Sequence, residues 1–183
     1  MMSPLAVIDK YYPHNDEQRS LLLHHSWQVA AKALRCAAAH PELSLDRELL
    51  LRGALLHDLG ILATRAPSIH CHGTEPYLMH GFIGARLLRQ LGYEAEARIC
   101  ERHTGTGLTA QTIREHKLSV EPQDYMPETL EEQLICYADK FYSKSRPDQE
   151  LTFVQVCTGL QRYGERGVEK FREWHKRFKV QTI

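Results

Sequence analysis

The dipeptide His57-Asp58 places two ionisable side chains at the end of the apolar run 49–56. A run of this length and composition is typical of a buried helix. Burying a carboxylate and an imidazole without partners costs on the order of several kcal/mol, and far more for a charged form. A bound cation would offset that cost directly. A His-Asp pair that is merely hydrogen-bonded at a helix C-terminus is the alternative, so the choice depends on further ligands.

Further candidate ligands follow in a fixed order along the chain: His25, His57-Asp58, His80, His103 and Asp139. From His57 onward the histidines are evenly spaced, with about one helix and its connection between successive members. Each is therefore expected on a different helix, as in bundles whose facing helices build a metal site. Four imidazoles and two carboxylates exceed what one tetrahedral ion uses, which favours two neighbouring cations sharing a carboxylate.

Helical periodicity dominates the sequence, and alternation of the β type is nearly absent. We expect an all-α fold: a single compact helical bundle over residues 1–183, with the metal site between helices. Helices are expected to begin after the caps Asp16, Asp46, Thr109 and Thr129 and to cover 77–91 and 94–102. The helix after Asp46 is expected to reach about Leu62. Residues 64–76 are expected as a loop over the site, and 151–180 as two helices broken near 164–167.

The chain resembles the HD-domain superfamily, whose signature is a His, then His-Asp, then a distal Asp, with extra His residues in its dinuclear branch. The matching blocks lie within residues 20–146 and are His25-Ser26, Leu56-His57-Asp58-Leu59-Gly60, Met79-His80-Gly81, His103-Thr104-Gly105 and Tyr137-Ala138-Asp139-Lys140. Several blocks are similar to the HDIG-type branch that hydrolyses nucleotides such as symmetrical diadenosine polyphosphates. The substrate stays open, because Ile61 replaces a Lys of cyclic-dinucleotide phosphodiesterases and 141–145 lacks the usual Glu-Pro.

This resemblance implies a ligand set in which Asp58 bridges two metals. His25, His57, Asp58 and Asp139 would hold one, and Asp58, His80 and His103 the other. Mixed imidazole and carboxylate ligands favour Fe, Mn, Co, Ni or Zn over Mg or Ca. The expected enzyme is a metal-dependent phosphohydrolase. It would use a metal-bridged hydroxide to cleave a phosphoester or phosphoanhydride bond of a nucleotide or other small phosphorylated metabolite.

Catalytic roles are expected for Asp58 and His57, and for Lys140, which follows a ligand directly. Substrate contacts are expected from residues beside the ligands or in nearby loops: Thr104, Lys140, Arg65, His72 and Arg146. Thr104 would orient the substrate or the reacting water, and the others would contact phosphate or edge the pocket. A solvated surface position is the competing interpretation for each of these side chains.

The amino-acid composition limits the kinds of partner that we expect the protein to bind. Lys plus Arg (23) equals Asp plus Glu (23), and no long basic run occurs, so binding to a nucleic-acid polymer is disfavoured. The five cysteines are scattered, which suits a reducing cytosol. No candidate signal peptide or membrane span occurs, and we expect a soluble, cytoplasmic protein. The aromatic stripe Phe171, Trp174 and Phe178 is expected as core or as a homodimer contact.

Two other functions compete with the hydrolase. A subset of the superfamily uses the same ligand order to hold a di-iron pair that activates oxygen and cleaves small polyol or phosphonate substrates. An HD domain that has lost its activity and serves in binding or signalling is the third alternative. Retention of all six candidate ligands in this chain counts against the latter.

Overall fold

The computed structural model describes residues 2–14 and 16–180, and α-helices dominate it. The helices are α1 (Pro4–Tyr11), α2 (Glu17–Ala39), α3 (Arg47–Leu56), α4 (His80–Gln90), α5 (Glu94–Arg102), α6 (Ala110–Glu115), α7 (Leu130–Asp139), α8 (Phe153–Gln161) and α9 (Glu165–Phe178). Short 3₁₀ turns include η2 (Leu59–Ala63) and η4 (Tyr77–Met79). The expected all-α class is confirmed.

The predicted helix starts are confirmed by capping hydrogen bonds. The Asp16 side chain accepts a hydrogen bond from the backbone N–H of Arg19, and the Asp46 side chain accepts one from that of Leu49. Thr109 caps α6, and Thr129 forms a reciprocal capping box with Glu132. These side chains satisfy N–H groups that have no partner inside the helix, so the chain enters each helix at a defined residue.

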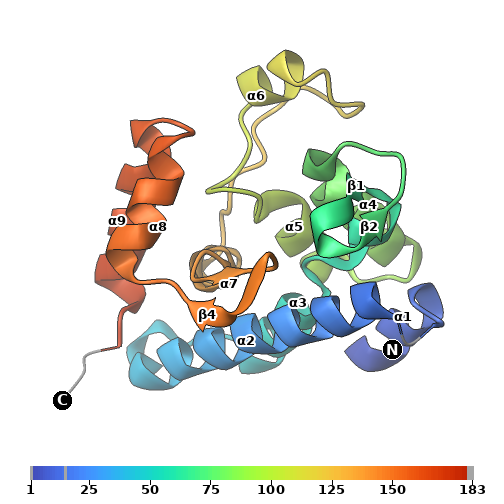
Figure 1. Ribbon diagram of the computed structural model, residues 1–183. Coiled ribbons are helices and arrows are strands. Elements are labelled where there is room, and N and C mark those ends of the chain that lie inside the picture. Colours follow the sequence, from blue (N-terminus) through green and yellow to red (C-terminus); the bar gives the residue numbers. More distant parts are fainter. Residues whose placement is uncertain (1, 15, 181–183) are drawn as a thin grey trace.

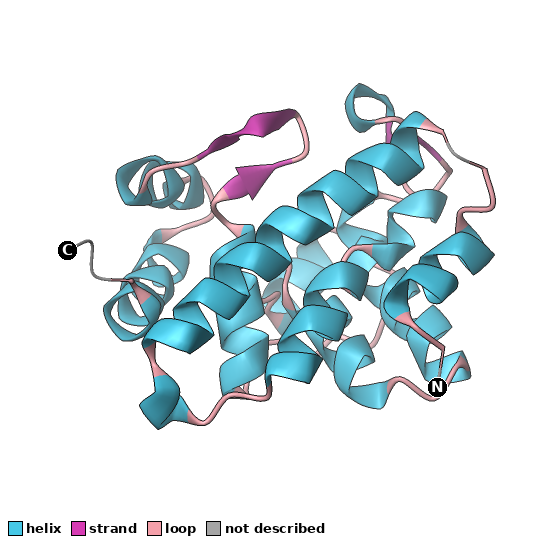
Figure 2. Cartoon of the chain, turned by 90° about the horizontal axis from the view of Figure 1, so that it is seen from below, coloured by secondary structure: helices cyan, strands magenta, loops and turns pink. Residues whose placement is uncertain are grey.

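The long helix α2 crosses the molecule, and the other elements assemble on it (Figures 1 and 2). Its C-terminal half packs with α3, α7, α8 and α9 in one buried apolar cluster, which includes Phe171, Trp174 and Phe178. Its N-terminal half packs with α1, η2, α4 and α5 in a second cluster. The aromatic stripe of α9 is therefore core, the first of its two predicted roles. The homodimer remains a prediction.

One predicted helix boundary near the His-Asp pair is wrong, and the loop predicted after it contains a short pair of strands. The helix that follows Asp46 ends at Leu56 rather than near Leu62, and the chain continues through a turn into η2. The ring Nδ1 of His57 bonds to the carbonyl oxygen of Ala54, and Gly60 lies against the backbone of α4, so a straight helix could not continue. The stretch 64–76 also contains a short antiparallel pair, β1 (Arg65–Ala66) with β2 (Cys71–His72).

A second hairpin was not predicted at all. Strands β3 (Tyr142–Ser143) and β4 (Arg146–Glu150) pair antiparallel, and Lys144 and Ser145 form the turn between them. The hairpin lies beside α2 in Figure 2, and the Gln28 side-chain amide donates a hydrogen bond to the carbonyl oxygen of Pro147 over 2.7 Å. Its short, mostly polar strands carry no apolar alternation, which explains why the sequence pattern missed it.

Glycines bring the elements that carry the candidate ligands into close contact. A Cβ atom on Gly60 would lie 2.1 Å from the carbonyl oxygen of His80, and one on Gly81 would lie 2.5 Å from that of Cys100. A Cβ atom on Gly84 would lie 2.5 Å from Sγ of Cys100. Because no side chain separates them, η2, α4 and α5 approach backbone to backbone. This approach places His57-Asp58, His80 and His103 around one point.

Ion pairs between partly exposed arginines and buried glutamates tie α5 to α3 and α7. The Arg52 guanidinium on α3 donates to Glu96 over 2.7 Å, and Arg98 on α5 donates to Glu132 on α7 over 2.8 Å. Both glutamates are buried, so losing either arginine would leave an unpaired charge in the interior. Among the described residues, no helix is long and apolar enough to cross a membrane.

Because Gly60 is in tight contact with α4, adding one methyl group at this position should lower the stability of the fold strongly. In Gly60→Ala the new Cβ would collide with backbone atoms of α4, which cannot rotate away, so we expect a loss of about 2–3 kcal/mol in the free energy of unfolding. Gly159→Ala is the matched control, because Gly159 lies in α8 with open space around its Cβ position. That change should stabilise by about 0.5–1 kcal/mol. Urea unfolding measures both, and similar values for the two variants would contradict the packing described.

Candidate metal centre

The six predicted ligands meet at one buried point. His25 lies within α2, His57 and Asp58 follow the last residue of α3 directly, and His80 begins α4. His103 follows α5 directly, and Asp139 is the last residue of α7. None of the six exceeds 7% exposure. As predicted, side chains from different helices therefore converge on one point.

Asp58 faces two pairs of imidazoles with its two carboxylate oxygens. Oδ2 lies 3.2 Å from Nε2 of His25 and 3.0 Å from Nε2 of His57. Oδ1 lies 3.3 Å from Nε2 of His80 and 3.4 Å from Nε2 of His103. One carboxylate is thus shared between two sets of nitrogen atoms.

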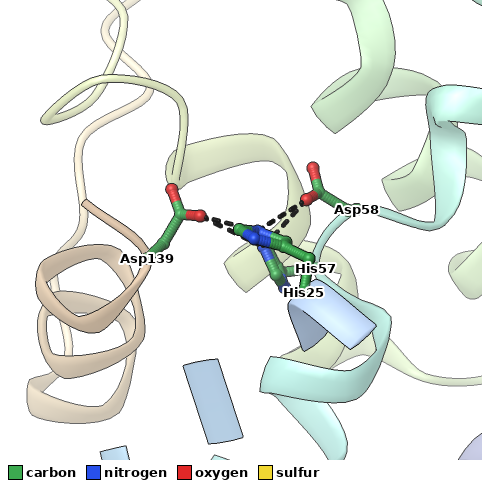
Figure 3. Close-up of side chains that lie close together, drawn as sticks. All are labelled: His25, His57, Asp58 and Asp139. Carbon is green, nitrogen blue, oxygen red and sulfur yellow. Dashed lines mark hydrogen bonds and ion pairs between the residues drawn. The ribbon is translucent and has the colours of Figure 1, made fainter. Parts of the chain in front are cut away.

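Asp139 completes the first set from the opposite side. Its Oδ1 lies 2.9 Å from Nε2 of His25 and 3.5 Å from Nε2 of His57, so the two imidazoles sit between two carboxylates (Figure 3). Within each set, His25–His57–Asp58–Asp139 and Asp58–His80–His103, the potential ligand atoms all lie within 4.8 Å of one another. Distances of this size leave room for a cation between the atoms of each set.

Backbone carbonyls fix the orientation of three of the four rings. Nδ1 of His57, His80 and His103 bonds to the carbonyl oxygen of Ala54, Tyr77 and Cys100, at 2.7, 2.6 and 2.7 Å. A carbonyl oxygen only accepts, so each Nδ1 carries its proton and a neutral ring presents a lone pair at Nε2. The Nε2 atoms of His80 and His103 face each other at 3.0 Å. Two facing lone pairs repel unless a cation or proton lies between them.

The charge states suit metal ligands. Burial alone would raise the pKa of Asp58, but the charges of His57 and Lys144 hold it well below its usual range. Burial lowers the pKa of His80 to about 3 and also lowers the pKa of His103, so both rings are neutral at neutral pH. Burial opposes the charged form of His57 as well, but the charge of Asp58 and the close approach of both carboxylates to its Nε2 raise the pKa of His57 to about 9. A metal bound to His57 would therefore displace a proton.

The residues present fit divalent cations. Both Asp58 oxygens and Nδ1 of His25 are buried without a hydrogen bond of acceptable geometry among the described residues. The Lys144 ammonium compensates Oδ2 of Asp58, but Oδ1 faces the neutral rings of His80 and His103, and a buried carboxylate oxygen in such a place favours a bound cation. The donor set is rich in imidazole and suits borderline transition metals better than Mg or Ca.

Two lysines enter the site, and the sequence predicted only one of them. Lys140 contacts the ligand Asp139, with 2.5 Å between Nζ and Oδ2. Lys144, from the turn of the β3–β4 hairpin, forms an ion pair with Oδ2 of Asp58. Burial opposes the charge of Lys144, but Asp58 raises its pKa, so the ammonium stays protonated. Its contact with Asp58 depends on a hairpin that has no helical or apolar signal, and for this reason it was missed.

A cavity of about 1080 Å³ opens from the centre and shows which predicted substrate residues lie near it. Thr104, Lys140 and the ligand Asp139 line this cavity. Thr104 Oγ1 is buried without a hydrogen-bond partner among the described residues. The other predicted residues, Arg65, His72 and Arg146, are exposed and do not line the cavity.

Comparisons with known proteins agree with this arrangement. An uncharacterized protein of Methanocaldococcus jannaschii is 40% identical over 121 residues, which is 64% of this chain and 64% of that protein. A tRNA (cytidine(56)-2'-O)-methyltransferase of Picrophilus torridus is 33% identical over 147 residues, covering 75% of this chain. The chain spans 64% and 38%, respectively, of the lengths of these relatives.

The fold is also shared with a solved domain. The HD domain of the L. monocytogenes phosphodiesterase PgpH in complex with cyclic-di-AMP aligns with a TM-score of 0.55 and 19% identity, over 95% of this chain and 94% of that one. A second structure of the same domain aligns with a TM-score of 0.56 and 20% identity, over 97% of this chain and 89% of that one. The family model of the HD domain matches residues 22–143, a segment that contains all six candidate ligands. The chain therefore belongs to the HD domain family, as its motifs predicted.

Proposed function

We propose that this protein is a metal-dependent phosphohydrolase that cleaves a phosphoester or phosphoanhydride bond in a nucleotide or other small phosphorylated metabolite. The observation that carries the proposal is the shared carboxylate of Asp58, with one imidazole pair on each of its oxygens. This arrangement supports two cations rather than one. When bound, such a pair supplies Lewis acidity and a water that is deprotonated near neutral pH.

Family membership and the shared fold support a metal-dependent hydrolase in general. The nucleotide assignment draws on the cyclic-di-AMP bound by the PgpH domain, and is a proposal for this chain. The methyltransferase activity in the name of one relative is not assigned to this chain, because the chain spans 38% of that protein. No side-chain nucleophile is required, because the proposed hydrolysis uses water as its nucleophile.

The protein's own residues have separable roles in this proposal. Asp58, Asp139 and the four imidazoles would hold the cations, while Asp139 and Lys140 lie on the side of the site that lines the cavity. Lys144 supplies a protonated ammonium beside Asp58, where it can bind a phosphoryl oxygen and orient the substrate. The hydroxyl of Thr104 can donate a hydrogen bond to the same group.

Single ligand substitutions should remove metals in a defined pattern. Asp58→Ala should lose both cations, whereas Asp139→Ala should lose only the one between His25 and His57, since Asp139 contacts no other ring. Hydrolysis of bis(p-nitrophenyl) phosphate by Asp58→Ala should fall by about three orders of magnitude. Metal content per chain by plasma mass spectrometry and initial rates with Mn²⁺ measure the two effects.

Asp148→Ala is the control for these variants, because Asp148 is an exposed carboxylate on β4 outside the centre. Circular dichroism shows whether each variant is folded. Equal activity of Asp58→Ala and wild type, or no transition metal in the wild type, would overturn the proposal. The same panel distinguishes the di-iron oxygenase. Phosphate release under anaerobic conditions supports the hydrolase, and a strict requirement for oxygen and iron supports the oxygenase.

The hairpin lysine should affect substrate binding and turnover rather than metal content. In Lys144→Met the kcat/KM for a phosphodiester should fall about 10- to 100-fold, because the substrate loses a charged partner. Metal content per chain should stay at the wild-type value. Lys176→Met, an exposed lysine on α9, is the control. Unchanged kinetics of Lys144→Met would remove Lys144 from the reaction, and a loss of metal would show that it only supports the ligands.

A further inference from the structure

The cavity continues well beyond the metal centre, toward the C-terminal helices. Its wall includes residues of α8, of α9 and of the turn between them, which stand opposite α6 in Figure 1. These helices lie outside residues 22–143, the segment matched by the family model. A volume of about 1080 Å³ lies at the upper end of small-molecule sites, which is more than a single phosphoryl group would fill. We call the part of the lining that comes from α8, α9 and the turn between them the distal wall. It is the part of the cavity that can set which substrate this chain binds.

The distal wall is positively charged in a chain with no net charge. Five cationic side chains and two carboxylates line the whole cavity: Lys140, Lys144, Arg162, Arg166 and Lys170, with Glu115 and Asp139. At the metal end, Lys140 and Lys144 are already paired with carboxylates. At the distal end, Lys170 pairs with Glu173, while Arg162 and Arg166 form no ion pair among the described residues. Glu115 accepts a hydrogen bond from Gln111.

The two unpaired arginines lie on either side of a turn whose neighbour, Gly167, lies close to the loop after the candidate ligand His103. Arg162 ends α8 and Arg166 lies in the first turn of α9, on either side of the turn at Gly164. A Cβ atom on the neighbouring Gly167 would lie 3.3 Å from Oγ1 of Thr106. Thr106 comes three residues after His103, so the start of α9 lies beside the same loop that carries Thr104, and Thr104, Thr106 and Arg166 line one cavity.

An exposed aromatic ring lies between these arginines in the sequence. Tyr163 lines the cavity and is 85% exposed. A tyrosine ring that lines the same cavity as two arginines is suited to stack on a nucleobase while the arginines bind phosphate. Arginine binds phosphate with a planar fork of donors, which makes it a strong partner for such a group.

We propose that Arg162 and Arg166 bind a second phosphoryl group of the substrate, away from the phosphodiester at the metal centre, and that Tyr163 stacks on the adjoining base. The substrate class is then a linear dinucleotide with a terminal phosphate. This inference rests on the proposed hydrolase for the position of the cleaved bond. The distal contacts themselves do not require metal.

The dinucleotides pApA and ApA test the inference, because they share the cleaved bond and differ only in the terminal phosphate. With the Mn²⁺-loaded wild type, the KM for pApA should be about tenfold lower than for ApA. In the double variant Arg162→Gln/Arg166→Gln that ratio should fall below about twofold, with the kcat for bis(p-nitrophenyl) phosphate unchanged. Arg172→Gln is the control, since Arg172 lies on α9 outside the cavity and pairs with Glu165.

Calorimetry with metal-free protein separates this inference from the proposed function. Wild-type protein that binds pApA about tenfold more tightly than ApA, and loses the difference in the double variant, supports the distal site even if no hydrolysis occurs. Hydrolysis of both dinucleotides with equal KM and equal affinity would overturn the distal site and leave the hydrolase intact. Neither hydrolysis nor discrimination would overturn both.

Discussion

The shared carboxylate of Asp58 is the constraint around which the structure is organised. It lies fully buried between two pairs of imidazoles, with the Lys144 ammonium paired to Oδ2 and the rings of His80 and His103 facing Oδ1. An interior carboxylate in this position is costly without positive charge, so the helices that surround it have to converge closely enough to supply ligands for cations. The glycines of η2 and α4 permit that convergence, and the Arg–Glu pairs of α5 hold it in place.

The parts of the fold that could be predicted are those with local or periodic signals. Asp16, Asp46 and Thr129 act as caps because each has a side-chain acceptor immediately before an apolar helical pattern. The order of ligands along the chain was also sufficient to predict the six residues that meet, since each stands at or near a helix end or on a buried face. Their meeting at one point needed the backbone contact at Gly60, which no local pattern specifies.

The sequence did not show where side chains from irregular or weakly patterned segments would lie. Lys144 depends on a hairpin with polar strands, and Arg162 and Arg166 depend on how α8 and α9 fold back along the cavity. Arg65 and His72 were assigned to the pocket because their loop lies close to the ligands in sequence, but their β1–β2 pair leaves both side chains exposed. Closeness to the ligands in sequence does not predict closeness in space here, because tertiary packing determines which side chains of a loop face the centre.

The most direct test of the central claim is anomalous diffraction from crystals of the protein grown with Mn²⁺. The account predicts two anomalous peaks, one between Asp58 and the His25–His57–Asp139 group and one between Asp58 and the His80–His103 pair. A fully loaded crystal with a single peak at only one of these groups would show that Asp58 does not bridge. Peaks at neither group, with density showing the six side chains hydrogen-bonded to one another, would contradict the account altogether.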